Sequence, residues 1–483
     1  MVTRHSPGKF FAGNRTGCRP PFRGIGEFTV RAARLSADTF RAGPVCACRP
    51  AFHHTIGPVH PRYIRKGIRP VFSTVCVIGL GYIGLPTAAA LAANGIDVIG
   101  VDVDPATVDL INAGRAPFVE PDLAVAVSGA VAMGRLRATT TPEPADAFVI
   151  AVPTPLQDDR AADLSYVRAA AASVGQVLKA GDLVILESTS PPGTTVELSR
   201  WLGKHRPDLT FPHESADVPD VRLAYCPERV LPGRTMIEIV TNDRIVGGVG
   251  EGCAERARAL YQVFTKGECL LTDATTAEMA KLGENAFRDV NIAFANELST
   301  VCDQLGVDAG DVIDLANRHP RVDILRPGPG VGGHCIAVDP WFIVSAAPRQ
   351  ARLVRLAREV NDGRPDYVLG EVVDTAGRFK DPVIACLGLA FKANIDDLRE
   401  SPALQIVTRL AERQVGRLLV AEPHIRELPE SLARTGVAQL VDVATAVRDA
   451  DVVVLLVDHD AFRGVKRTTL RGKAVFDTRG FWR

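Results

Sequence analysis

The chain has 483 residues, of which 46% are hydrophobic and 23% are charged, a composition typical of a globular protein with two or three domains. Its 56 Lys and Arg side chains balance its 56 Asp and Glu side chains, so the net charge gives no argument for binding nucleic acid or an anionic membrane. No apolar run approaches the roughly 20 residues that a membrane-spanning helix needs. We therefore expect a cytoplasmic protein with neither nucleic-acid nor membrane partners.

Residues 1–73 differ in composition from the rest of the chain. They contain 13 Lys and Arg but only two acidic residues, and their many Pro and Gly residues follow neither a helical nor a strand period. They lack the apolar core of a signal peptide, and Pro and Gly interrupt the amphipathic helix of a transit peptide. We interpret residues 1–73 as a disordered or non-native extension, with targeting and nucleic-acid contact as the alternatives.

The ten cysteines are scattered and form no CxxC pair. In a long chain without a secretion signal, this pattern favours reduced thiols over disulfides. The spacing does not fit a structural zinc site, so we expect no metal.

A dinucleotide-binding pattern begins after residue 73. Residues 75–79 are apolar at almost every position and predict a buried parallel strand, which leads into Gly79-Leu-Gly81-Tyr-Ile-Gly84. An Ala-rich helix over residues 85–93 and a second strand over residues 97–101 follow, and Asp102 ends that strand. This order of strand, glycine motif, helix, strand and acid predicts a Rossmann-like βαβ unit.

Each part of this pattern has a role in binding a dinucleotide. Gly79 permits the tight turn, Gly81 allows the backbone to approach a pyrophosphate, and Gly84 allows the helix to pack against the strand. Asp102 can accept hydrogen bonds from a ribose diol and would repel a 2′-phosphate, which favours NAD over NADP. The alternative is a glycine-rich turn with a purely structural role.

The α/β pattern then continues and repeats. Strands are predicted over residues 147–152, 183–187 and 245–249, and Thr154 and Thr189 follow the first two, at the sheet edge where ligands bind. Helical patterns occupy residues 276–302 and 348–379. A second α/β unit follows, with strands at 383–389, 417–421, 451–457 and 474–477 and a helix at 402–413.

We therefore expect an α/β protein with two Rossmann-like domains joined by helices. Its predicted parts are the extension (1–73), a dinucleotide-binding domain (74–270), a central helical domain (271–380) and a second Rossmann-like domain (381–483). The second Rossmann-like domain has no GxGxxG motif after its first strand, so it should bind something other than a dinucleotide in the same manner.

Two features of the central part can carry chemistry. Lys281, Asn285 and Arg288 are spaced to share one face of a helix, although such polar stripes are often only solvated faces. Glycine occupies four of the six positions 328–333, a pattern that suits close backbone approach to a ligand. Cys335 follows this segment, and His334 or a nearby cation could lower the pKa of its thiol. The alternative for Cys335 is a small core residue.

A thiol beside a nicotinamide permits a four-electron oxidation. A thiol adds to an aldehyde to give a thiohemiacetal, hydride transfer yields a thioester, and water releases an acid. Alcohol could thus become acid in one site with two NAD.

These motifs resemble the UDP-glucose/GDP-mannose dehydrogenase family, and the resemblance covers residues 74–483. It rests on the glycine motif already described and on further segments: Val152-Pro-Thr-Pro155, Glu187-Ser-Thr189, Pro227-Glu228, Lys281-Leu-x-x-Asn285, Gly332-Gly-His-Cys335 and the stretch from Phe391-Lys392 to Arg399-Glu-Ser401. It implies NAD-dependent oxidation of the C6 alcohol of a UDP-sugar to a uronate used in surface polysaccharide. Further matches favour UDP-N-acetyl-D-mannosamine as the sugar, with UDP-N-acetylglucosamine or UDP-glucose as the alternatives.

The resemblance also implies roles for individual residues. Cys335 is the nucleophile, Lys281 exchanges protons and stabilises oxyanions with Asn285, Glu228 activates water for thioester hydrolysis, and Asp339 assists near Lys281. The implied cofactor contacts are Gly79, Gly81, Tyr82, Ile83, Gly84, Asp102, Thr154, Thr189 and Arg399. The implied substrate contacts are Arg229, Val230, Lys281, Asn285, Arg288, Gly332 and Lys392, with His319 and Arg321 reaching the site of a neighbouring subunit in a homodimer or larger homo-oligomer. The second Rossmann-like domain would bind the UDP moiety.

Two other kinds of protein share part of this pattern. A β-hydroxyacid dehydrogenase also joins a Rossmann domain to a helical domain bearing Lys and Asn, but it needs neither Cys335 nor a second α/β domain. A non-enzymatic NAD sensor would have no use for Cys335, Lys281 and Glu228 together.

Overall fold

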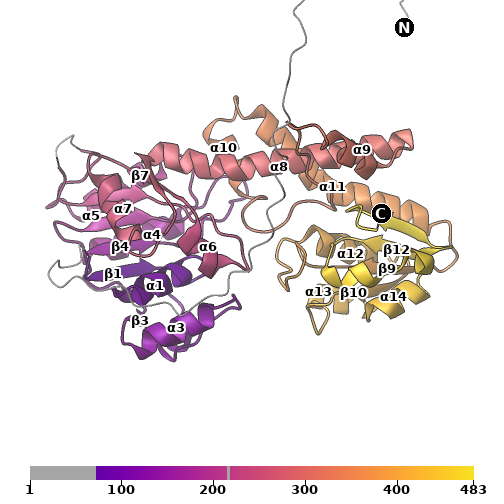
Figure 1. Cartoon of the computed structure of the whole chain (residues 1–483), viewed down its shortest axis with the longest axis horizontal. Helices are drawn as coiled ribbons and strands as arrows, with labels where there is room; N and C mark the ends of the chain where they lie inside the picture. The colour runs from indigo at the N-terminus through magenta and orange to yellow at the C-terminus, as the bar shows by residue number, and fades with distance from the viewer. Residues whose placement is uncertain (1–71, 215–217, 483) are drawn as a thin grey trace, which may run out of the picture. The chain divides into compact units, whose positions relative to one another are not determined.

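The computed structural model describes residues 72–214 and 218–482 (Figure 1). The predicted extension therefore lies outside the described residues, apart from its last two. Within the described ranges, none of the helices combines the length and apolar character needed to span a bilayer.

The first sheet has eight strands in the order β3-β2-β1-β4-β5-β6-β7-β8. All neighbours pair in parallel except β6 and β7, which are antiparallel. The strands are β1 (Thr74–Ile78), β2 (Asp97–Val101), β3 (Leu136–Thr139), β4 (Ala147–Ile150), β5 (Leu183–Leu186), β6 (Arg222–Tyr225), β7 (Arg244–Gly248) and β8 (Cys269–Asp273). Because β2 and β4 flank β1, the chain reverses direction across the sheet beside the glycine motif, where open α/β sheets bind ligands.

Both faces of this sheet are covered, which explains why its central strands are apolar at every position. Val75 and Val77 face one buried cluster, whereas Cys76 and Ile78 face another, as the two-residue period of a strand requires. The covering helices are α1 (Gly84–Ala93), α2 (Pro105–Asn112), α3 (Leu123–Ala132), α4 (Ser165–Gly175), α5 (Thr194–His205), α6 (Thr235–Thr241) and α7 (Cys253–Tyr261).

The central helices begin directly at the edge of the first sheet. Asp273 ends β8 and caps α8 (Ala274–Leu305) by accepting a hydrogen bond from the Thr276 amide. Gly306, at φ 68°, ends this 32-residue helix in the left-handed conformation. The other central helices are α9 (Ala309–Ala316), α10 (Asp339–Ala346) and α11 (Arg352–Ala376), and both α10 and α11 pack against α8.

The second sheet has five parallel strands in the order β11-β10-β9-β12-β13. They are β9 (Val383–Leu387), β10 (Arg417–Ala421), β11 (Ala438–Leu440), β12 (Val452–Leu455) and β13 (Ala474–Asp477). Its helices are α12 (Pro402–Glu412), α13 (Glu430–Ala433), α14 (Val443–Asp449) and the 3-10 turns η1 (Asp460–Gly464) and η2 (Arg467–Leu470).

The predicted α/β class, with two Rossmann-like units joined by helices, is confirmed. Every strand predicted from an apolar run is present. The sequence patterns missed β3, β6, β8 and β11, and they did not indicate that β6 and β7 run antiparallel.

Candidate active site

The glycine motif after β1 forms a tight turn that leaves open space at one position. Gly79 has φ +93°, and a Cβ there would lie 2.5 Å from the Ala151 carbonyl oxygen. A Cβ on Gly84 would lie 1.9 Å from the Gly79 carbonyl oxygen, so both positions require glycine for internal packing. A Cβ on Gly81 would meet nothing within 4 Å, and no side chain caps α1 at Ile83. The motif thus presents a helix N-terminus and accessible backbone, which fits a pyrophosphate.

Asp102 supports this turn from the end of β2. Its Oδ2 accepts a hydrogen bond from the Leu80 amide at 3.0 Å, and its Oδ1 accepts one from the Asp104 amide at 3.0 Å. Asp102 is only half-buried, and a carboxylate has about four acceptor positions. It therefore retains capacity for a ribose diol, so these residues fit the NAD that the fingerprint predicts.

An aromatic pair lies beside the same turn. The Tyr82 ring stacks on Phe118 at 4.2 Å between centroids, and the Arg399 guanidinium lies 5.5 Å from the Tyr82 ring centroid. Arg399 also forms an ion pair with Asp397 at 2.7 Å. Arg399 thus reaches the glycine motif from a distant part of the sequence.

The two threonines at the sheet edge lie together. The Thr154 hydroxyl donates a hydrogen bond to the Thr189 carbonyl oxygen at 2.6 Å, which joins the segments that follow β4 and β5. Both residues are half-buried.

Cys335, Lys281, Asn285 and Asp339 form the second part of the candidate site. Asp339 begins α10, and its amide donates a hydrogen bond to the Cys335 carbonyl oxygen at 2.8 Å, which places the carboxylate one turn after the cysteine. The Asn285 amide donates to Asp339 Oδ2 from α8. Lys281 lies one turn before Asn285 and interacts electrostatically with both Asp339 and Cys335. Two helices thus bring an ammonium, an amide and a carboxylate to one thiol.

Burial and neighbouring charges act in opposite directions on the ionisation of this group. Desolvation and the nearby Asp339 raise the pKa of the Cys335 thiol, although Lys281 and Lys392 act in the opposite direction. The His334 ring lies 3.9 Å from Asp397, and desolvation lowers the pKa of this ring. Burial raises the pKa of Asp339 to about 6, only partly offset by Lys281 and Asn285.

Lys392 lies near the thiol from the second Rossmann-like unit. Its ammonium is 3.4 Å from the Pro232 carbonyl oxygen, and it interacts electrostatically with Glu120 and Cys335. Desolvation lowers the pKa of Lys392 despite these acidic neighbours.

Glu228 belongs to a buried ionic group that the sequence patterns did not indicate. Arg244 Nη2 donates to Glu228 Oε1 at 2.5 Å, and Arg244 Nη1 lies 3.9 Å from Glu187 Oε1. All three side chains are nearly inaccessible to solvent. Burial and the charge of Glu228 raise the pKa of Glu187, which accepts hydrogen bonds from Thr87 and Tyr261. Nothing in the sequence around Arg244 distinguishes it from a surface residue at the start of a strand.

Several predicted substrate residues have partners of their own. Arg229 forms an ion pair with Glu284 at 2.6 Å, and Val230 packs partly buried against the core of the first sheet. On the same helix as Glu284, the Glu278 carboxylate accepts hydrogen bonds from the Gly193 and Thr195 amides at the start of α5.

Three predicted residues are not brought to the thiol within the described chain. Arg288 is exposed on α8, and His319 and Arg321 are exposed in the segment after α9. His319 Nδ1 accepts a hydrogen bond from the Arg321 amide at 3.3 Å, so these two residues form a local turn.

The glycine-rich segment before Cys335 is packed by the protein itself. A Cβ on Gly328 would lie 2.9 Å from Arg479 Nη1, one on Gly330 would lie 3.0 Å from Pro402 Cβ, and one on Gly332 would lie 2.3 Å from the Glu400 carbonyl oxygen. These glycines therefore allow close approach of neighbouring chain segments. Contact between this backbone and a ligand stays a prediction.

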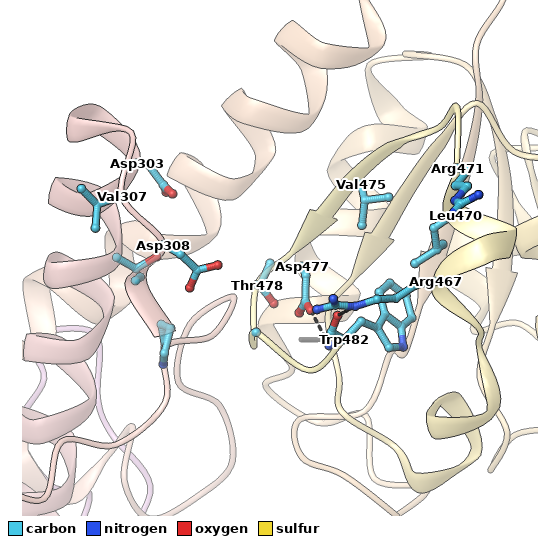
Figure 2. Close-up of a pocket in the computed structure, with 14 residues that line it drawn as sticks. Asp303, Val307, Asp308, Arg467, Leu470, Arg471, Val475, Asp477, Thr478 and Trp482 are labelled. Carbon is cyan, nitrogen blue, oxygen red and sulfur yellow. Dashed lines mark hydrogen bonds between the residues drawn. The ribbon is translucent and has the colours of Figure 1, made fainter. Parts of the chain in front are cut away.

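A cavity of about 470 Å³ lies elsewhere, between the end of α8 and the edge strand β13 (Figure 2). Asp303, Val307 and Asp308 line one side, and Asp477 and Trp482 lie on the other. None of the residues singled out from the sequence lines it.

One His and Glu cluster among the described residues has the composition of a metal site. Glu422, His424 and His459 approach one another near the end of β10. However, His459 Nδ1 accepts a hydrogen bond from the Asn394 amide, so Nε2 carries the proton that faces Glu422 at 3.0 Å. Both ring nitrogens are therefore already occupied by structural hydrogen bonds.

Comparison with known proteins matches three consecutive parts of the chain to the domains of one family. Residues 73–265 match the NAD binding domain of the UDP-glucose/GDP-mannose dehydrogenase family, residues 275–363 match its central domain, and residues 385–483 match its UDP binding domain. The cofactor of the first domain is accordingly NAD.

Whole-chain relatives extend this match. The chain is 60% identical over 411 residues to an NDP-N-acetyl-D-galactosaminuronic acid dehydrogenase of Ralstonia nicotianae, covering 85% of this chain and 96% of the relative. It is 54% identical over 420 residues to the UDP-N-acetyl-D-mannosamine dehydrogenase of Escherichia coli K12, covering 85% of this chain and all of the relative. A UDP-D-ManNAc dehydrogenase structure from Pyrococcus horikoshii superposes with a TM-score of 0.75 at 38% identity, covering 85% of this chain and 96% of that one. With all three domains matched in order, the chain belongs to the UDP-glucose/GDP-mannose dehydrogenase family.

Proposed function

We propose that this protein is an NAD-dependent dehydrogenase that oxidises the C6 alcohol of UDP-N-acetyl-D-mannosamine to UDP-N-acetyl-D-mannosaminuronate, a precursor of surface polysaccharide. The observation that carries the proposal is the convergence of Lys281, Asn285 and Asp339 at Cys335. A dehydrogenase that stopped at the aldehyde or ketone would have no need for a thiol in this place.

The first Rossmann-like domain holds the cofactor. When bound, NAD would supply the hydride acceptor for each of two successive oxidations at C6 of the sugar, one NAD being consumed in each. The accessible Gly81 backbone and the α1 N-terminus would bind its pyrophosphate, and Asp102 would bind its ribose. Tyr82, beneath Arg399, would border the same site.

The first oxidation requires a base for the C6 hydroxyl proton, and the second requires the thiol. Lys281 exchanges this proton, and the Asn285 amide, which has a second N–H, donates to the developing oxyanion. Cys335 then attacks the aldehyde carbon: a C–S bond forms, the C=O π bond becomes the oxyanion that Asn285 stabilises, and the thiol proton passes to Asp339. A second hydride transfer from C6 of this thiohemiacetal would give the thioester. The pKa of Asp339, about 6, suits a carboxylate that accepts a proton near neutral pH, which offsets the raised pKa of the thiol.

Hydrolysis of the thioester completes the reaction. Glu228 removes a proton from a water molecule, the water oxygen attacks the carbonyl carbon, and Cys335 leaves as a thiolate. The ion pair with Arg244 holds the Glu228 carboxylate in one orientation. Its other oxygen accepts a hydrogen bond from the Arg229 amide at 3.1 Å.

The UDP moiety would bind at the second Rossmann-like domain. Lys392 provides a cation close to Cys335, and its desolvated ammonium suits a diphosphate. Arg229, Val230, Arg288 and Gly332 are the other residues proposed to contact substrate.

We further propose that the active protein is a homodimer with shared sites. Phe287, Phe294, Val301 and Leu305 are 44–70% exposed and recur along α8 at intervals of seven and four residues. This spacing makes an apolar stripe suited to pairing with the same helix of a second copy. His319 and Arg321, which face solvent in one chain, would then reach the neighbouring site.

One observation favours a second candidate sugar. A relative named for N-acetyl-D-galactosaminuronic acid has 60% identity, compared with 54% for one named for N-acetyl-D-mannosamine. UDP-N-acetylgalactosamine is therefore the alternative substrate, oxidised at C6 by the same residues.

The deciding experiment is NADH formation by the purified protein with a panel of UDP-sugars. UDP-N-acetyl-D-mannosamine should give two NADH for each sugar consumed and no free aldehyde, and it should have the highest kcat/KM. A higher value with UDP-N-acetylgalactosamine would establish the alternative. One NADH for each sugar, with aldehyde accumulating, would refute the thiol mechanism.

Two variants separate the proposed roles. Cys335→Ala should abolish acid formation while NAD still binds. Glu228→Gln should allow both hydride transfers but stall hydrolysis, giving a burst of NADH and a mass increase on the peptide that contains Cys335. Near-normal uronate formation by Cys335→Ala would show that the thiol is structural.

A further inference from the structure

The peptide at one end of the Cys335 segment is held by two buried side chains. The Gly328 amide donates a hydrogen bond to Asn296 Oδ1 at 2.8 Å, and the Gly328 carbonyl accepts one from Arg364 Nε at 3.1 Å. Asn296 on α8 is 1% exposed and Arg364 on α11 is 4% exposed. Arg364 is itself fixed by Thr300, whose hydroxyl is 2.7 Å from Nη1. Side chains from two helices therefore form hydrogen bonds with both the amide and the carbonyl group of Gly328.

The other end of the segment is attached to the same group of side chains. Arg358 Nη1 contacts the Ile336 carbonyl oxygen at 3.5 Å and donates to Asp289 Oδ1 at 2.6 Å. Asn361 donates to Asp289 Oδ1 at 2.8 Å and accepts from Asn296 Nδ2 at 2.9 Å. A continuous chain of hydrogen bonds thus connects the anchors of Gly328 and Ile336, and Cys335 lies directly before the second anchor.

This hydrogen-bond network contributes little to the stability of the fold. Asp289 and Arg358 are 0% and 1% exposed, and desolvation raises the pKa of Asp289 despite the guanidinium beside it. Among the residues that the structure describes, Asp289 Oδ2 and Arg358 Nε have no hydrogen-bond partner. The desolvation of a buried ion pair offsets much of its attraction, and apolar side chains of similar volume often stabilise a protein equally well. What the polar chain provides is a defined location for the two ends of the loop.

We infer that Asn296 and Arg364, supported by Asn361, Asp289 and Arg358, are positioning residues that fix the backbone around Cys335 for attack on the aldehyde. The expected effect on the rate of oxidation rests on the proposed function. The expected effect on the position and hydrogen exchange of the loop does not. A displacement of about 1 Å at a reacting atom can lower a rate by about 100-fold. Loss of these anchors should therefore affect the chemical step more than cofactor binding.

Asn296→Leu removes the acceptor for the Gly328 amide at nearly constant volume. We expect kcat to fall at least 10-fold, while the Kd for NAD stays within twofold of the unmodified protein. Amide hydrogen exchange in the peptide containing residues 327–335 should accelerate at least 10-fold, and the rate at which iodoacetamide alkylates Cys335 should change. Asn296→Asp keeps an acceptor oxygen for the same amide and should restore both slow exchange and most of kcat.

Asp362→Asn is the matched control, because Asp362 pairs with Arg358 from a side chain that is 41% exposed and is not one of the two anchors of residues 328–336. It should leave kcat, exchange and alkylation unchanged. If Asn296→Leu fails to fold, the comparison of Asn296→Asp with Arg364→Lys decides: Arg364→Lys lacks the Nε donor and should accelerate exchange at residues 327–335.

Other outcomes overturn the inference. Unchanged exchange and kcat in both Asn296→Leu and Arg364→Lys would show that the loop does not depend on these anchors. If the unmodified protein oxidises no UDP-sugar, the proposed function fails, but exchange and alkylation still test the positioning role.

Discussion

The two Rossmann-like units place an acid in the same position but use it differently. Asp102 after β2 accepts a hydrogen bond from the Leu80 amide, and Glu422 after β10 accepts one from the Leu389 amide at 2.7 Å. Glu422 is 5% exposed and is covered by His459, whereas Asp102 is half-buried. Both units thus have a carboxylate that accepts a hydrogen bond from the loop after the first strand. Only in the first unit is that carboxylate accessible to a ribose.

The loops that donate hydrogen bonds to these acids also differ between the two units. Gly79-Leu-Gly81-Tyr-Ile-Gly84 corresponds to Gly388-Leu-Ala390-Phe-Lys392-Ala in the second unit. Gly79 and Gly388 share the same left-handed conformation, at φ +93° and +94°. At the next glycine position, however, Ala390 adds a Cβ where Gly81 leaves open space. The second loop thus carries a lysine where the first loop has the glycines of a dinucleotide turn. This difference favours anion binding by the lysine side chain in the second unit and by backbone amides in the first.

The largest expected effect tests the open space at Gly81. Gly81→Val should leave the fold intact, because a Cβ there meets no atom within 4 Å, but it should block the approach of a pyrophosphate. We expect the Kd for NAD to rise at least 100-fold, about 3 kcal/mol, with the melting temperature nearly unchanged. Isothermal titration and thermal unfolding measure the two quantities.

Gly388→Ala is the contrasting substitution in the second unit. Its Cβ would lie 2.4 Å from Val457 Cβ in a left-handed conformation, so the variant should lose about 3 kcal/mol of unfolding free energy. Should Gly81→Val bind NAD normally, the distinction between the two loops would be wrong.

Asp339 is a third carboxylate to compare with Asp102 and Glu422, and its burial in the folded protein disfavours its ionised form. Its pKa of about 6 lies above the value of 3.8 in an unfolded chain, so its contribution to stability is complete at low pH and is lost as the pH rises through about 6. Asp339→Asn should therefore be more stable than the unmodified protein by about 2–3 kcal/mol at pH 8, with the difference vanishing toward pH 4. Its kcat should fall. Denaturant unfolding at both pH values provides the measurement, and a variant that is less stable at pH 8 would contradict the assignment.

Glu422 should show the opposite dependence on pH. Burial alone would raise the pKa of Glu422, but hydrogen bonds from His459 and backbone amides lower it overall. Its contribution is therefore present above its ordinary pKa and is lost as the pH falls through the lowered value. Glu422→Gln should cost about 2 kcal/mol at pH 7 and less at pH 4, since it removes charged hydrogen bonds. A pH-independent difference in unfolding free energy would argue that the Glu422 pKa is not lowered.

The smallest expected effect concerns cofactor choice. Asp102→Ala removes the ribose acceptor and the charge that repels a 2′-phosphate. The preference for NAD over NADP in kcat/KM should narrow by about 10-fold, about 1.4 kcal/mol. Part of the loss with NAD will reflect the freed Leu80 amide, so Asp102→Asn, which keeps an acceptor oxygen for that amide but removes the charge, is the control. An unmodified protein that used both cofactors equally would remove the basis for this comparison.

Local sequence was sufficient to predict the strongest elements of the fold. Buried parallel strands such as β1, β4 and β12 are apolar at nearly every position, and glycine at positions 79, 81 and 84 follows β1 in the order that a βαβ turn requires. Two of the strands that were missed lack this signal. β8 is only partly buried and β11 has three residues, so neither needs a continuous apolar run.

The sequence by itself also identified candidate residues of the site, because Cys335 follows an unusual run of glycines and because Lys281 and Asn285 share a helical face. Only the tertiary structure decided their electrostatic state and support. Arg244 reaches Glu228 across 16 positions, and Asn296 reaches Gly328 across 32. The glycines of residues 328–333 pack against segments more than 30 residues away. Burial and pairing between distant segments set pKa values and loop positions, and no local pattern encodes which distant side chain fills a given space.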